Sequence, residues 1–137
     1  MINNNDNSDF DIEVPSEKFI SNQFENNLAY AEGQQALVQD AIIKAEVKTD
    51  RLTKRTGNVY VEYKSRGADS GLFTTKSDWW IFQIVNEQEE TLFSILISTK
   101  RLKHIIKYGG YRQAAGGDDH TSMGWLVPIK DLIDTNK

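Results

Sequence analysis

Apolar residues recur every three or four positions over residues 21–40, which is the pattern of one buried face of an α-helix. The stripe consists of Phe24, Leu28, Ala31, Gln35, Val38 and Ile42. One member, Gln35, is polar, and Gly33 weakens the middle of the helix by about 1 kcal/mol relative to alanine. We therefore expect an amphipathic helix over about residues 21–40.

Beyond this stripe the apolar period falls to two residues, which is typical of β-strands. Apolar and polar side chains alternate over residues 45–53 and again over residues 58–65. The segment between them, Lys54–Asn58, has the composition of a turn. The pattern therefore predicts that the two strands pair as a hairpin.

The pattern in the second half of the chain predicts three more strands and two helices. Over residues 78–85, large apolar residues occupy odd- and even-numbered positions alike, including Trp79 and Trp80. This pattern is expected of a central strand whose two faces are covered. The other expected elements are a strand over 91–98, a helix over 99–108, a loop over 109–124, a strand over 125–129 and a small final helix. This order indicates an α+β (mixed α/β) chain with a single central mixed β-sheet flanked by helices.

Length and composition exclude several classes of protein. The 137 residues fit one domain, which we place at 16–137 after a flexible, acidic, Asn- and Asp-rich arm over 1–15. The absence of cysteine excludes disulfide scaffolds, zinc–cysteine sites and thiol nucleophiles. No apolar run approaches the roughly 18 residues of a membrane helix, and the first residues lack a signal-peptide pattern. We therefore expect a soluble, cytoplasmic protein without a membrane partner.

The net charge of −4 is unevenly distributed. Residues 1–40 carry eight acids and one base, whereas residues 41–137 carry 15 bases and 12 acids, a net charge of +3. Within residues 44–76, eight bases accompany four acids. Because a local patch decides whether a polyanion can dock, this stretch indicates a nucleic-acid contact, although such charge runs are equally typical of solvated surface.

Three residues of this basic stretch have the chemistry of phosphodiester hydrolysis. Glu62 and Lys64 are two positions apart on a predicted strand, so we expect their side chains on one face, about 7 Å apart. In the predicted hairpin, Asp50 lies on the neighbouring strand near Glu62. Two close carboxylates form an oxygen site suited to Mg²⁺ or Mn²⁺. Such an ion acidifies a bound water, and a neighbouring ammonium orients that water or contacts the phosphate.

Two other interpretations of these residues stay open. The same spacing is typical of an exposed hairpin that carries a cross-strand salt bridge. In addition, Glu46 and Lys48 form a second E-x-K pair, with Asp40 as the earlier acid. Only five residues separate Asp40 from Glu46, which leaves too little chain for two paired strands, so this register ranks second.

Two segments carry a family resemblance: EVKTD at 46–50, and TGNVYVEYKSRGADSGLFTTKSDWW at 56–80, after a helix and before a strand, a helix and a strand. This arrangement resembles the PD-(D/E)XK nuclease superfamily, in particular its small phage-type and Holliday-junction-resolvase-like members. The likeness covers about residues 24–108 and implies a restriction-endonuclease-like core of helix, three strands, helix and strand.

The resemblance also implies roles for individual residues. Asp50 and Glu62 take the positions of the metal ligands, and Lys64 takes that of the catalytic lysine. The first helix of the family commonly adds an acid that faces the metal. Gln35, with Glu32 one turn earlier, occupies the matching face, and its neutral side chain departs from the pattern. The proline of the family hallmark is also absent, because a threonine precedes Asp50.

A magnesium-dependent deoxyribonuclease is the function that the resemblance implies, acting on double-stranded or branched DNA in the cytoplasm (of a host cell, if a phage encodes the chain). A symmetric junction cut would require a homodimer. Phosphate contacts are expected from Arg51, Arg55, Arg66, Thr75, Lys76 and Arg112. A non-catalytic nucleic-acid-binding module on the same scaffold is the alternative, favoured by the neutral Gln35. The third hypothesis is a protein-interaction domain in which the charges of the hairpin have no functional role.

Overall fold

The computed structural model of the chain describes residues 17–137, with side chains from Tyr30 onward; the predicted arm over 1–15 lies outside the described residues. The chain divides into two compact units, Met1–Leu37 and Val38–Lys137, and this boundary lies inside the domain predicted for 16–137. The helices are α1 (Glu17–Lys44), α2 (Thr53–Thr56), α3 (Thr99–Gly109) and α4 (Ile129–Ile133), with single 3₁₀ turns η2 (Gly71–Phe73) and η3 (Asp118–His120). The strands are β1 (Glu46–Asp50), β2 (Asn58–Ser65), β3 (Ala68–Asp69), β4 (Trp79–Val85), β5 (Thr91–Ser98), β6 (Gln113–Gly116) and β7 (Ser122–Pro128).

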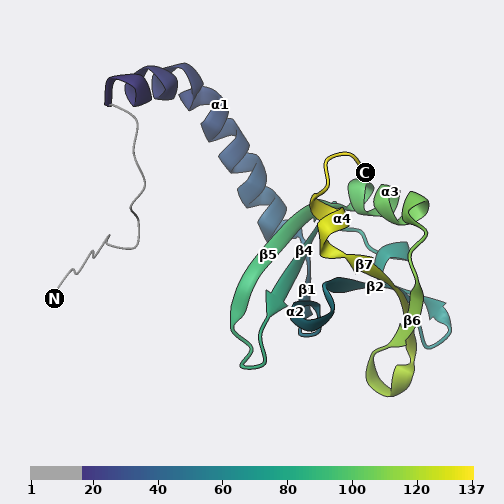
Figure 1. Cartoon of the computed structure of the whole chain (residues 1–137). Coiled ribbons are helices and arrows are strands. Elements are labelled where there is room, and N and C mark those ends of the chain that lie inside the picture. Colours follow the sequence, from purple (N-terminus) through teal and green to yellow (C-terminus); the bar gives the residue numbers. More distant parts are fainter. Residues whose placement is uncertain (1–16) are drawn as a thin grey trace. The chain divides into compact units, whose positions relative to one another are not determined.

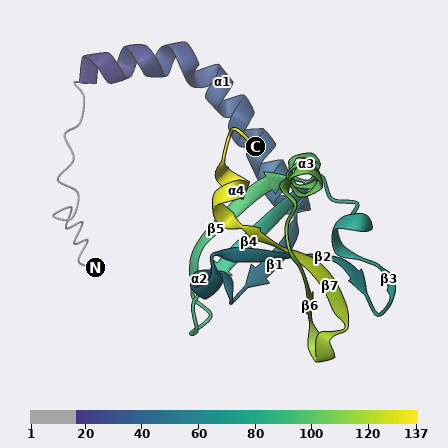
Figure 2. The same cartoon turned by 45° about the vertical axis from the view of Figure 1, so that its right-hand side comes forward.

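The strands form two sheets, which Figures 1 and 2 show from two sides. The three-stranded sheet has the order β1-β4-β5, with β1 parallel and β5 antiparallel to β4. The four-stranded sheet has the order β3-β2-β7-β6 and is antiparallel throughout. The α+β class is therefore confirmed, but a mixed sheet and an antiparallel sheet replace the single central sheet that the sequence predicts.

The predicted hairpin of residues 45–53 and 58–65 is wrong. β1 pairs with β4 in one sheet, and β2 pairs with β7 in the other. The reason lies in the connection, because β1 ends at Asp50 and the short helix α2 follows where the strand was expected to continue. Gly57 closes α2 in the left-handed conformation, with φ of 73°. The connection thus turns the chain from one sheet into the other.

The segment expected as a loop over 109–124 contains β6 and η3, and β7 begins at Ser122. Two glycines of this segment lie against the ring of Tyr60. A Cβ atom on Gly116 or Gly124 would collide with the ring of Tyr60, so both positions leave room for that ring against the sheet. The Tyr60 hydroxyl shares a hydrogen bond of 2.9 Å with the hydroxyl of Ser122. Glycine here permits close packing on a sheet face.

Both sheets and the helices α3 and α4 contribute to one hydrophobic core. Its fully buried large side chains include Val59 and Val61 of β2, Trp80, Phe82 and Ile84 of β4, Leu102 of α3 and Val127 of β7. Burying one such side chain stabilises the fold by about 1.5–3 kcal/mol. The alternation of β4 explains the asymmetry of its two tryptophans, since Trp80 is fully buried whereas Trp79 is 37% exposed. Among the described helices, none combines the length and the apolar character that crossing a membrane requires.

Candidate functional site

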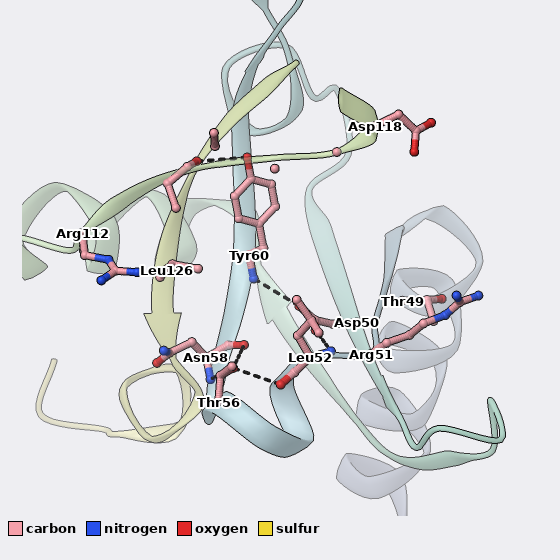
Figure 3. A pocket seen from close by; sticks show the side chains of 14 residues that line it. Thr49, Asp50, Arg51, Leu52, Thr56, Asn58, Tyr60, Arg112, Asp118 and Leu126 are labelled. Carbon is pink, nitrogen blue, oxygen red and sulfur yellow. Dashed lines mark hydrogen bonds between the residues drawn. The ribbon is translucent and has the colours of Figure 1, made fainter. Parts of the chain in front are cut away.

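Asp50 ends β1 and holds the turn that follows it. Its Oδ1 accepts hydrogen bonds from the backbone N–H groups of Leu52 (2.8 Å) and Thr53 (2.9 Å). Its Oδ2 accepts a hydrogen bond of 3.3 Å from the N–H of Tyr60 on β2 (Figure 3). The carboxylate therefore joins the end of β1, the start of α2 and the edge of β2, which is a structural role that its residue type suits well.

Glu62 lies two residues beyond Tyr60 on β2. Its Oε1 accepts a hydrogen bond of 2.5 Å from the hydroxyl of Ser70. Burial raises the pKa of Tyr60, the hydrogen bond with Ser122 opposes that rise, and the negative charge of Glu62 adds to it. Asp50 therefore contacts β2 two residues before Glu62, although the two acidic residues belong to different sheets.

A β-bulge lies between Glu62 and Lys64. Glu62 pairs with Gly124, whereas Lys64, two residues further along, pairs with Met123, so Tyr63 is the extra residue. Paired residues turn their side chains to the same side of a sheet, and consecutive residues of β7 turn to opposite sides. Glu62 and Lys64 therefore face opposite sides of the four-stranded sheet. The prediction that they share a face is wrong, because the bulge interrupts the alternation on which it depends.

The predicted metal ligands lie on α1, β1 and β2 and belong to the two different units of the chain. Within the described part of the chain, no three His, Asp or Glu side chains are placed so that they could hold a metal ion. Glu32 and Gln35 have exposed side chains on α1 and belong to the first unit, whereas Asp50 and Glu62 belong to the second. The metal-binding and catalytic roles of these four residues and of Lys64 stay predictions.

Ion pairs neutralise half of the basic residues in 44–76. The pairs are Lys44–Asp40 (3.1 Å), Lys48–Glu46 (2.7 Å), Arg51–Glu89 and Lys54–Glu87 (3.2 Å). In the last pair, the pKa of Glu87 is lowered first by a hydrogen bond from its own backbone N–H and then by Lys54. Exposed pairs of this kind stabilise a fold little, but they do reduce the charge available to a polyanion.

The six residues predicted to contact phosphate do not form one surface. Arg51 and Arg112 line a hollow of about 760 Å³ beside Tyr60 (Figure 3). The same hollow contains Asp50 and Asp118, so its lining carries as many acids as bases. The other four lie on α2, at the β2–β3 turn and before β4: Arg55, Arg66, Thr75 and Lys76. Of these, Thr75 uses its hydroxyl oxygen to accept a hydrogen bond from the N–H of Ser77.

A concentrated positive surface lies instead on α3. Its exposed side chains include Lys100, Lys103, His104, Lys107 and Tyr108, and its sequence contains no acid. Among the described residues, no carboxylate lies within ion-pair distance of the three lysines. The first turn carries Lys100 and Arg101 where a helix favours acids, which costs about 0.3–1 kcal/mol for each base. The helix therefore accumulates positive charge at the expense of its own stability.

An aromatic cluster lies beside this helix. Phe73, which is 56% exposed, packs against Tyr63 and Trp125, with ring centroids 5.3 and 5.6 Å apart. Tyr63 and Trp125 are 4.3 Å apart. Phe73 and Trp125 line a hollow of about 450 Å³ together with Leu72, Lys103, Ile106 and Lys107, which we call the lysine–aromatic hollow. It combines exposed aromatic surface with two lysines, and the Lys107 ammonium lies 5.3 Å from the centre of the Tyr108 ring.

This site is not among the sites predicted from the sequence, although the sequence does show the positive charge of α3. Residues 99–109 contain four Lys or Arg, one His and no acid, a local excess that a tally over 44–76 does not include. Phe73 and Trp125 lie 52 positions apart, and only the packing of η2 against β2 and β7 brings their rings together.

Comparison of the chain with family models, curated proteins and solved structures finds no match.

Proposed function

We propose that this protein binds nucleic acid through α3 and the lysine–aromatic hollow, with a preference for unpaired bases. The observation that carries the proposal is the hollow itself, where Lys103 and Lys107 adjoin the exposed ring of Phe73. Ammonium groups attract the phosphate backbone, and an aromatic ring beside them offers a surface on which a base stacks.

The bulge adds a third cation on this side of the sheet. The pairing of Lys64 with Met123 turns Lys64 toward the face that also carries Trp125. An exposed lysine therefore accompanies the aromatic cluster from the strand side, while Lys103 and Lys107 flank it from α3. Because a base inside a duplex has both faces covered by its neighbours, stacking on Phe73 favours single strands, loops or ends.

Fluorescence anisotropy with a labelled single-stranded oligonucleotide tests the proposal. Lys103→Ala and Lys107→Ala should each reduce the slope of log affinity against log salt by about 0.7. Lys54→Ala is the matched control, because it changes the net charge equally at an ion-paired lysine on α2, which lies far from α3 in both views (Figures 1 and 2). An unchanged slope in both hollow variants would refute the assignment.

Phe73→Ala tests the stacking contact separately. The loss of one base–aromatic stack costs about 1–3 kcal/mol, which is roughly a 5- to 150-fold weaker affinity for single strands. The salt slope should stay the same, because no charge is removed. Phe93→Ala, at another exposed phenylalanine on β5, serves as the control. Equal losses in the two variants would show that Phe73 has no specific contact with the bases.

Metal-dependent cleavage of the bound nucleic acid is a second candidate function. The observation that favours it is the contact of Asp50 with the backbone of Tyr60, two residues before Glu62. Nicking of plasmid and branched DNA with Mg²⁺ or Mn²⁺, against a chelator, tests this function. Glu62→Gln should abolish nicking and Glu87→Gln should retain it, whereas equal activity in both variants would exclude Glu62 from the chemistry. Asp50 is unsuitable for this test because it also holds the turn after β1.

A further inference from the structure

The helix α1 carries an apolar seam with a heptad repeat. Along Phe24, Leu28, Ala31, Gln35, Val38 and Ile42, the steps alternate strictly between four and three residues. This alternation is the a and d pattern of a coiled coil, with Leu28, Gln35 and Ile42 at a positions. A helix that packs on a sheet or core commonly has a wider apolar face instead.

The seam is exposed where the structure describes its side chains. Val38 is 47% exposed and Ile42 is 51% exposed, and Ala31 and Gln35 are exposed as well. Phe24 and Leu28 continue the same seam by their positions in the sequence. Apolar residues in such a repeat on one exposed helix stripe indicate a surface that another helix covers.

The covering helix must have the length and the repeat of α1 to interdigitate along it. Within the described part of the chain, the other α-helices have 4, 11 and 5 residues, so none of them matches. The described helix that does match is α1 itself, in a second copy. We infer that two copies of this chain associate through a parallel two-stranded coiled coil of their α1 helices.

The polar residue in the seam supports the parallel arrangement. In a parallel pair, residues at a positions face their own copies, so Gln35 meets Gln35 of the second copy and the two side-chain amides can hydrogen-bond. One buried amide at an a position fixes register and strand number at some cost in stability. The g and e positions beside the seam bring no two like charges together. Gln34 would face Gln39 of the second copy, and Asn27 would face Glu32.

Sedimentation velocity of the full chain at micromolar concentrations tests the inference. The wild-type chain should sediment with twice the mass of one chain, and Ile42→Asp should shift it to the mass of one chain. Ile43→Asp is the matched control, because Ile43 is 81% exposed but lies about 100° around the helix from the seam. A monomeric wild type, or the same mass for both variants, would overturn the inference.

Cross-linking tests the orientation and does not depend on the stability of the aspartate variants. The chain has no cysteine, so Gln35→Cys introduces a single thiol. Mild oxidation should join two Gln35→Cys chains by a disulfide in high yield. Asp40→Cys, on the outer side of the same helix, should stay largely uncoupled. Equal yields for the two variants, or no disulfide at position 35, would overturn the parallel pairing. Neither experiment involves nucleic acid, so their outcome is separate from that of the binding assays.

Discussion

The carboxylate of Asp50 should matter more for folding than its place in a nuclease-like motif suggests. It accepts three backbone hydrogen bonds, from the N–H groups of Leu52, Thr53 and Tyr60. Asp50→Ala leaves all three donors without this acceptor. Asp50→Asn keeps one carbonyl oxygen, which can still accept the two bonds of the turn.

The expected cost follows from these contacts. Removing a side-chain acceptor at the start of a helical turn costs about 0.5–2 kcal/mol. The bond to Tyr60 adds about 1–2 kcal/mol, since it is made to an ionised group in a half-buried position. Asp50→Ala should therefore lower the free energy of unfolding by about 1.5–4 kcal/mol, and Asp50→Asn by about half of that. This is a large share of the roughly 5–15 kcal/mol that stabilises an ordinary domain.

Urea unfolding followed by tryptophan fluorescence measures this cost, because Trp80 lies in the core. Thr49→Ala is a suitable control, since Thr49 is the neighbouring residue and its exposed hydroxyl donates to the side chain of Gln83. An Asp50→Ala chain that unfolds within about 0.5 kcal/mol of the wild type, the usual range for surface substitutions, would contradict this structural role of Asp50. A stable Asp50→Ala chain would also make that variant usable in nuclease assays.

Two further substitutions test other parts of the fold. Burial raises the pKa of Tyr111 from its ordinary value of 10 to about 12, and the Asp131 carboxylate adds to that rise. The Tyr111 hydroxyl donates a hydrogen bond of 2.9 Å to this carboxylate. The folded chain thus holds this proton more tightly than the unfolded chain, so stability present below pH 10 should be lost as the pH rises to about 12. Tyr111→Phe should lack that loss in urea unfolding at increasing pH. At Gly71, a Cβ would collide with the carbonyl oxygen of Glu62, so Gly71→Ala should cost more than about 3 kcal/mol. Gly67→Ala, also at positive φ but in open space, should cost about 1–2 kcal/mol in the same assay.

The elements that depend on local periodicity agree with the sequence analysis. The stripe of α1, the strands β4 and β5 and the amphipathic α3 all occupy their predicted segments. The two helices have a helical repeat of apolar residues, whereas β4 and β5 are short, nearly continuous apolar runs. The apolar residues at odd- and even-numbered positions of β4 predict that both of its tryptophans are buried. Trp80 is buried as this pattern predicts, but Trp79 is not.

The candidate site was less predictable, because it depends on which strands become neighbours. The alternation over 45–53 and 58–65 indicates two strands, but it carries no information about the partner of each. A short connection between two strands favours a hairpin. Here the connection contains α2, and Asp50 accepts hydrogen bonds from the N–H groups at the start of that helix. The bulge at Tyr63 then separates Glu62 from Lys64, and no spacing rule reveals a bulge.

Local periodicity in the sequence was enough to predict α1, α3, β4 and β5, the α+β class and the heptad repeat of α1, but not α2 or β6. Tertiary structure alone decided the pairing of β1 with β4, the opposite faces of Glu62 and Lys64, and the meeting of Phe73 with the lysines of α3. These features join residues that are distant in the chain, or depend on one inserted residue in a strand. Their free energy comes from packing and pairing between elements, which a local pattern does not contain.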